Sequence, residues 1–351
     1  MNNNYRLPSE WEQQSAIALI WPDKNTDWNA YLDEITETYI QLAMIITNYE
    51  RLLVISPNVE DTKSLLKKRL TDNNFNRIVF SFCENNDTWA RDVLPITLVP
   101  SCNASDKESL FLDFKFNGWG KKFKYDKDNK LNRKIFSQSV LNGTIVNCKD
   151  FILEGGSIET DGKGTLFTTS SCLLAPNRNE LMSKQKIEEK FLDIFDSIKR
   201  IIWIEHGALR GDDTDGHIDT ILRCAPNNTL LYIATEDKLD DHFDDLNKLD
   251  KQVRSLRTLD NKPYRFLPLI LPKPIYYNGE RLPATYANFL ILNGAVIVPT
   301  YRQKNNDTNA LSIIKKAFPN HDIIGVDASV IIRQHGSIHC LTMQLPKGCL
   351  K

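Results

Sequence analysis

The sequence lacks several features that would place the protein in a specialised class. No apolar run approaches the ~20 residues of a membrane-spanning helix, and residues 1–6 lack the basic and then apolar pattern of a signal peptide. The seven cysteines include no Cys-x-x-Cys pair, which argues against a disulfide framework and a zinc ribbon. Excess charge is also absent, because the net charge is -1. We therefore expect no nucleic-acid partner, no membrane partner and a cytoplasmic location.

The composition and the hydrophobic pattern of the sequence indicate a globular chain of the α/β class. The 351 residues are 41% hydrophobic and 25% charged, enough for a sizeable core. Short apolar runs alternate with segments whose apolar residues recur every three or four positions, which predicts alternating strands and helices. The predicted strands are 16–21, 52–55 and 78–82, and the predicted helices cover 28–46 and 59–70.

Turn residues organise the second half of the chain. Asp161 to Gly164 predicts a hairpin between 157–159 and 166–169, and Asn293-Gly294 predicts another between 287–292 and 295–298. Five prolines between Pro263 and Pro283 predict an extended, irregular connection.

The stretch from Gly211 to Thr220, Gly-Asp-Asp-Thr-Asp-Gly-His-Ile-Asp-Thr, combines four carboxylates with one imidazole. If residues 217–221 form a strand, His217 and Asp219 lie on the same face. An EF-hand is excluded, because with Gly216 in the glycine position the required glutamate would be Leu222. The pattern favours a functional site, in which Asp212 and Asp215 shape the turn.

Polar residues that follow or precede short strands recur at a nearly regular spacing. Glu154 follows Asp92 by 62 residues, His217 follows Glu154 by 63, and Cys340 follows His217 by 123. A long, regular interval indicates large modules around an axis, each of which directs one residue inward. The skipped step falls near 279–288.

Cys340 is a candidate nucleophile, because it follows a glycine-containing turn and has polar neighbours. A single cysteine with a distant histidine and carboxylates is typical of thiol catalysis, although the spacing alone leaves an ordinary thiol equally open. A zinc site of His217, His339 and Cys340 is disfavoured, because adjacent residues of a strand point to opposite faces. The other six cysteines are interpreted as core or surface thiols.

Seven motifs in a fixed order identify a family. They lie at 7–12, 88–92, 116–120, 153–157, 211–219, 282–289 and 338–340. Together they resemble the agmatine deiminases, in the peptidylarginine-deiminase-like branch of the guanidine-modifying superfamily. The resemblance implies a five-bladed α/β propeller of ββαβ-type modules, formed by one domain over 1–351, with the fifth module near 286–289. Thr220 and the run 334–337 depart from the family pattern. These departures bear on the substrate preference and not on the chemistry.

The resemblance also implies a reaction: hydrolysis of agmatine to N-carbamoylputrescine and ammonia, without cofactor or metal. Cys340 attacks the guanidinium carbon, Asp92 and Asp219 hold the guanidinium, and His217 acts first as acid and then as base. Glu154 orients His217 or has a purely structural role.

For the substrate tail, Trp89 and Trp119 are expected to flank the aliphatic chain, and Asp213 to meet the distal ammonium. Core packing of the tryptophans and solvation of Asp213 are the alternatives. The expected partner is thus a small cationic guanidine, and the family is compatible with a homo-oligomer. Deimination of free or peptidyl arginine, amidino transfer and non-catalytic binding on the same fold remain alternative functions.

Overall fold

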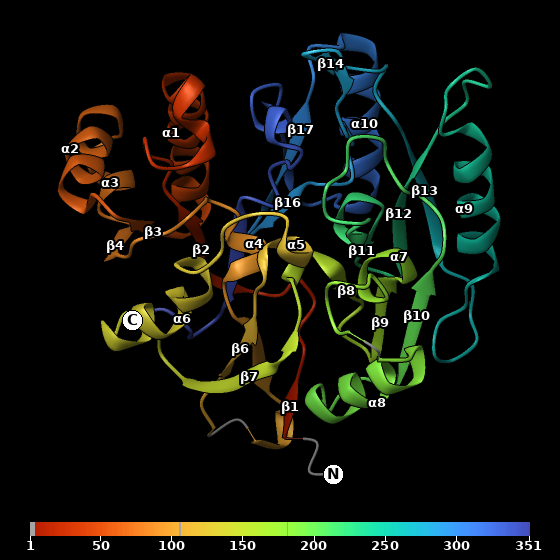
Figure 1. Ribbon diagram of the computed structural model, residues 1–351, viewed down its shortest axis with the longest axis horizontal. Helices are drawn as coiled ribbons and strands as arrows, with labels where there is room; N and C mark the ends of the chain where they lie inside the picture. The colour runs from red at the N-terminus through yellow and green to blue at the C-terminus, as the bar shows by residue number, and fades with distance from the viewer. Residues whose placement is uncertain (1–3, 105–106, 181) are drawn as a thin grey trace.

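The computed structural model describes residues 4–104, 107–180 and 182–351. In this part of the chain, the strands form five sheets of three or four strands and one two-stranded sheet. Ten α-helices connect them, and the longer ones lie toward the periphery of the molecule in Figure 1, whereas the short α4 and α5 lie near its centre. The fold is therefore mixed α/β, as predicted.

Three of the larger sheets are built mainly from residues 5–204, and a strand from the C-terminal end joins the first of them. The first has the order β19 (Thr342–Pro346), β2 (Gln14–Ile20), β3 (Arg51–Ser56) and β4 (Ile78–Phe82). The second has the order β1 (Tyr5–Arg6), β5 (Ile96–Pro100), β6 (Leu110–Lys115) and β7 (Thr144–Ile152). The third has the order β10 (Arg200–Ile204), β9 (Thr165–Thr169) and β8 (Ile158–Thr160).

The C-terminal half supplies the remaining sheets. They are β11 (Leu222–Ala225), β12 (Thr229–Ala234) and β13 (Arg265–Ile270); β16 (Leu290–Leu292), β17 (Ala295–Thr300) and β18 (Asp322–Asp327); and the hairpin of β14 (Tyr276–Tyr277) and β15 (Glu280–Arg281). Each of the five larger sheets combines an antiparallel pair with a parallel pair, for example β11 with β12 and β12 with β13. The same combination of strand pairs therefore recurs in all five larger sheets.

Helices make the crossovers between parallel strands. The α-helices are α1 (Leu32–Tyr49), α2 (Val59–Arg69), α3 (Asp72–Phe75), α4 (Ala90–Val93), α5 (Gly118–Lys121), α6 (Leu131–Ser137), α7 (Ser170–Leu173), α8 (Lys184–Ile194), α9 (Phe243–Ser255) and α10 (Lys304–Ala317). The short 3-10 helices are η1 (Asp27–Tyr31), η2 (Cys102–Ala104), η3 (Asp128–Lys130), η4 (Gly155–Ser157), η5 (Ile218–Thr220) and η6 (Ile331–Gln334). No helix in the described residues is long and apolar enough to span a membrane.

The predicted strands and helices of the first 82 residues are confirmed, as are both hairpins. The irregular connection predicted for the proline-rich segment is wrong in part, because β13 runs through Pro268 and pairs with β12. β13 is an edge strand, where a residue without an N–H is tolerated. The strand predicted at 217–221 is also wrong: Ile218–Thr220 forms η5, and β11 begins only at Leu222.

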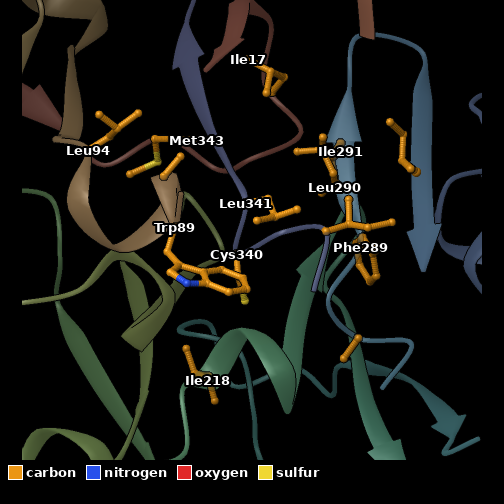
Figure 2. Packing of buried hydrophobic residues seen from close by; sticks show 14 of the residues in the cluster. Ile17, Trp89, Leu94, Ile218, Phe289, Leu290, Ile291, Cys340, Leu341 and Met343 are labelled. Atoms are coloured by element: carbon orange, nitrogen blue, oxygen red, sulfur yellow. The ribbon is translucent and has the colours of Figure 1, made fainter. Parts of the chain in front are cut away.

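The hydrophobic core extends directly beneath the candidate site. Figure 2 shows Trp89 and Cys340 beside buried apolar side chains, including Leu341 and Ile218. Ile218 and Leu341 have no exposed surface. The polar residues of the candidate site are therefore held in place by apolar neighbours, because the side chains of a close-packed core cannot move independently.

Candidate active site

One cavity of about 310 Å³ collects most of the predicted residues. Its lining includes Trp89, Asp92, Trp119, Asp213, His217 and Cys340. Asp219 and Glu154 do not line it, but their side chains contact residues that do. All eight predicted side chains are therefore in or beside a single site.

Each of the five larger sheets has a polar residue of this site shortly before one strand of an antiparallel pair. Asp92 precedes β5, Glu154 precedes β8, His217 precedes β11 and Cys340 precedes β19. The fifth residue, Asn288, precedes β16 and fills the skipped step of the spacing. Its role was not predicted from the sequence, although the position was marked by that gap and lies in a family motif.

Cys340 lies in the turn before β19, and its side chain is surrounded by acceptors. Its Sγ lies 3.3 Å from Oδ1 of Asn288 and 3.6 Å from Oδ2 of Asp219. The Cys340 amide also donates to Oδ1 of Asn288. Burial, together with the charges of Asp219 and Asp92, raises the pKa of the Cys340 thiol well above its ordinary value. The free site therefore holds a protonated thiol, and a cationic ligand is needed to favour the thiolate.

His217 has carboxylates on both sides of its ring. Nδ1 lies 3.6 Å from Oδ1 of Asp92, and Nε2 lies 3.9 Å from Oε2 of Glu154. Burial alone would lower the pKa of His217, but the carboxylate of Asp92 and the further contacts with Cys172 and Glu154 raise it well above the ordinary value. An imidazolium is thus available as a proton donor at neutral pH.

Asp92 is held rigidly by two donors. Its Oδ1 accepts the Gly156 amide and its Oδ2 accepts Nε1 of Trp119, each at 2.9 Å. Trp119 has φ 52°, a left-handed conformation that is costly for an aromatic residue and is common at functional sites. Burial raises the pKa of Asp92, although His217 opposes the shift.

Asp219 has one occupied and one free oxygen. Oδ2 accepts from Nδ1 of His339 at 2.8 Å, whereas Oδ1 is buried and has no hydrogen-bond partner among the described residues. Burial alone would raise the pKa of Asp219, but the hydrogen bond and charge of His339 lower it below its ordinary value. Asp219 is therefore a carboxylate with one acceptor available to a ligand.

Glu154 forms an ion pair that the sequence did not reveal. Nε of Arg178 lies 3.1 and 3.0 Å from the two oxygens of Glu154, and Arg178 continues to Oδ2 of Asp215 and the carbonyl of Thr214. Burial alone would raise the pKa of Glu154, but the charge of Arg178 lowers it. Arg178 thereby connects Glu154, the carboxylate beside His217, to the acidic turn at 211–220. On that turn, Asp212 accepts the Gly216 amide, in agreement with its predicted shaping role.

One group in the described part of the chain has metal-ligand spacing: Glu154, Cys172 and His217, whose ligand atoms lie within 4.8 Å of one another. The guanidinium of Arg178 is already bonded to Glu154 and would repel a second cation there. The set His217, His339 and Cys340 considered from the sequence is not this group, since His339 points to Asp219 and Glu10.

The lining of the cavity is rich in aspartates. Besides Asp213, its lining includes Asp27, Asp87 and Asp212. Burial raises the pKa of Asp213 to about 6, and burial with neighbouring carboxylates raises that of Asp87 to about 8. Arg333 also lines the cavity, but both its terminal nitrogens bind Glu34, at 3.1 and 2.9 Å. At neutral pH Asp87 is therefore protonated, and Asp213 is the carboxylate of the two that can meet a cation.

Comparisons with known proteins identify the family of this chain. The model of the Porphyromonas-type peptidyl-arginine deiminase family matches residues 6–346. The chain belongs to this family. A curated family relative from Mycoplasma capricolum, provisionally named agmatine deiminase, is 33% identical over 370 residues, with 98% of this chain and 96% of the relative covered.

Solved structures resemble the family member described here over almost the whole chain. A Cys-to-Ser variant of the C. jejuni agmatine deiminase with substrate bound is 38% identical, with a TM-score of 0.88 and coverage of 99% of this chain and 97% of the other. A Porphyromonas gingivalis protein provisionally named arginine deiminase is 41% identical, with a TM-score of 0.91 and coverage of 99% and 100%. Both names describe removal of a guanidine nitrogen.

Proposed function

We propose that the protein hydrolyses agmatine to N-carbamoylputrescine and ammonia. The observation that carries this proposal is one cavity whose lining combines Cys340, His217 and Asp92 with four further aspartates. Agmatine carries a guanidinium at one end and an ammonium at the other, so both ends would meet opposite charge. Relatives named agmatine deiminase support the same reaction.

In the proposed mechanism, carboxylates recognise the guanidinium. Asp92 and the free Oδ1 of Asp219 accept its N–H groups and hold its charge. The bound cation offsets the carboxylates that keep the Cys340 thiol protonated, and the thiol releases its proton to solvent to become a thiolate. Because the guanidinium carbon is then held beside Sγ of Cys340, the attack no longer depends on a random encounter in solution.

The chemistry proceeds in two steps. The thiolate of Cys340 attacks the guanidinium carbon, and the tetrahedral adduct expels ammonia when imidazolium His217 protonates the departing nitrogen. Neutral His217 next removes a proton from water, and the resulting hydroxide attacks the carbon of the cationic amidino-thioether. The adduct expels the thiolate of Cys340, and loss of the hydroxyl proton to solvent leaves the neutral urea product. We assign Glu154 the role of orienting His217, and Arg178 the role of holding Glu154 in place.

We further propose that the five larger sheets form the five blades of a propeller, in one domain over 1–351. The support is the repeated strand pattern and the polar residue in or beside the cavity that lies shortly before a strand of each sheet. Trp89 and Trp119 are assigned to the walls around the aliphatic chain, and Asp213 to the distal ammonium.

Deimination of free arginine is the second candidate, because a similar structure carries a provisional arginine deiminase name. An arginine carboxylate would need a cation in the cavity. Arg333 lines the cavity, but Glu34 compensates its charge. Lys122 is likewise engaged with Asp215 and the carbonyl of Asp213. The acidic lining therefore favours agmatine.

The deciding assay is ammonia release from agmatine, arginine and a peptidyl-arginine by wild type and Cys340→Ala. We expect turnover of agmatine by wild type only. No turnover of any guanidine would refute the enzymatic function, equal activity of Cys340→Ala would refute the mechanism, and loss of activity with a chelator would point to a metal.

A further inference from the structure

We propose that His339 and Glu10 form a positioning dyad that fixes the carboxylate of Asp219 for guanidinium binding. The proposal rests on the function above and assigns a role to two residues that touch neither the cavity nor the substrate. His339 is adjacent to the nucleophile in sequence, whereas Glu10 comes from the N-terminal segment between β1 and β2.

The imidazole of His339 lies between two carboxylates. Nδ1 is 2.8 Å from Oδ2 of Asp219, and Nε2 is 3.0 Å from each oxygen of Glu10. A carboxylate only accepts hydrogen bonds, so both ring nitrogens must donate and the ring carries a positive charge. His339 is 1% exposed, which makes both contacts strong and geometrically specific.

Glu10 is itself held in place by two buried arginines. Nη1 of Arg91 lies 2.9 Å from its Oε1, and Nη2 of Arg223 lies 2.6 Å from its Oε2. Arg223 also binds Glu159 through Nε at 2.7 Å. The dyad is therefore anchored to the helix that carries Asp92 and to β11, which begins just after Asp219.

This arrangement decides which oxygen of Asp219 is free. Oδ2 is already occupied by His339, so the buried, unpartnered Oδ1 is left for a substrate N–H. The same Oδ2 lies 3.6 Å from Sγ of Cys340. A rotation of the carboxylate would thus change both guanidinium binding and the surroundings of the thiol.

A positioning role and a merely structural role predict different losses. If the dyad only supports packing, its removal should impair every reaction of Cys340 alike. If it fixes Asp219, its removal should impair reactions with cationic amidine groups far more than reactions with neutral groups of the same shape. The matched probes are chloroacetamidine, which is cationic, and chloroacetamide, which is neutral.

The experiment measures the rate of Cys340 alkylation by each probe in wild type, His339→Asn and Glu10→Gln. Asn keeps a donor near Nδ1 but loses the positive charge and the contact with Glu10. We expect the amidine-to-amide rate ratio to fall about tenfold or more in both variants, and kcat/KM for agmatine to fall on the order of 10- to 100-fold, the usual cost of losing an orienting partner. An unchanged ratio would overturn the proposal.

Glu12→Gln is the matched control, because Glu12 lies on the same segment but pairs with Arg6 at 2.5 Å, away from the site. It should leave the ratio unchanged. The double variant should be no worse than either single variant, as expected for residues that act as one unit. If His339→Asn does not fold, Glu10→Gln decides alone. The alkylation ratio does not require turnover, so failure of the agmatine assay remains distinguishable from failure of the dyad.

Discussion

Arg178 and Glu154 form an ion pair in which neither side chain is exposed, with Nε 3.0 Å from Oε2. The pair stands behind His217, whose Nε2 is 3.9 Å from the same oxygen. A charge buried at this depth is tolerated only with its partner, so loss of Arg178 would destabilise the fold. Because Glu154 also contacts His217, the same pair affects the protonation of His217. Four predictions follow from this and from the neighbouring contacts.

Arg178→Gln should destabilise the protein by about 3 to 5 kcal/mol, because it leaves Glu154 as an unpaired buried charge. It should also lower kcat, since a Glu154 that takes up a proton no longer supports imidazolium His217. Denaturant unfolding and steady-state kinetics measure the two effects. Arg69→Gln is the control: its pair with Glu37 is exposed and should contribute little to stability. Equal losses in both variants would contradict the argument.

Gly156→Ala should reduce kcat/KM about 100-fold or more. A Cβ at this position would lie 2.6 Å from Nδ1 of His217, 2.9 Å from Oδ1 of Asp92 and 3.2 Å from Oδ2 of Asp219. The methyl group would therefore displace the catalytic groups themselves. Gly279→Ala, where no atom lies within 4 Å of the added Cβ, should cost some stability because φ is +85° but leave kcat/KM intact. Normal kinetics in Gly156→Ala would show that the site tolerates rearrangement.

Alkylation of free Cys340 by a neutral reagent should require alkaline pH. Burial and the charges of Asp219 and Asp92 raise its pKa, so the thiolate population should rise only above the ordinary thiol value of about 8.5. A cationic amidine should react at lower pH, because its charge favours the thiolate. Mass spectrometry of the Cys340 peptide against pH measures both profiles. Coincident profiles would argue against activation by the substrate charge.

Asp213→Asn should raise KM for agmatine about tenfold, the value of a hydrogen bond to a charged group. Butylguanidine, which lacks the distal ammonium, should be unaffected. Because the pKa of Asp213 is raised to about 6, wild-type KM for agmatine should increase as the pH falls through 6 and the carboxylate becomes neutral. Initial-rate kinetics with both substrates test this; an equal effect on butylguanidine would place Asp213 elsewhere in the mechanism.

The sequence predicted the local elements well where hydrophobic periodicity was strong. The strands of the first 82 residues, the Asn293-Gly294 hairpin and the convergence of Asp92, His217 and Cys340 agree with the structure. The reason given for pairing His217 with Asp219 was wrong, because they lie in a 3-10 turn rather than on a strand. Alternation over five residues does not distinguish a strand from a turn whose ends are fixed by neighbouring sheets.

By itself, the sequence determined which residue types are available and at what intervals, because motif order and spacing are properties of the chain. Tertiary structure alone decided the partners behind the site. Arg178 joins Glu154 across 24 positions, and Glu10 reaches His339 across 329. Such pairs leave no local pattern, since the charges become partners only when separate sheets bring them together in a dry interior. That burial also sets the protonation of Cys340 and His217, which no spacing of residues can specify.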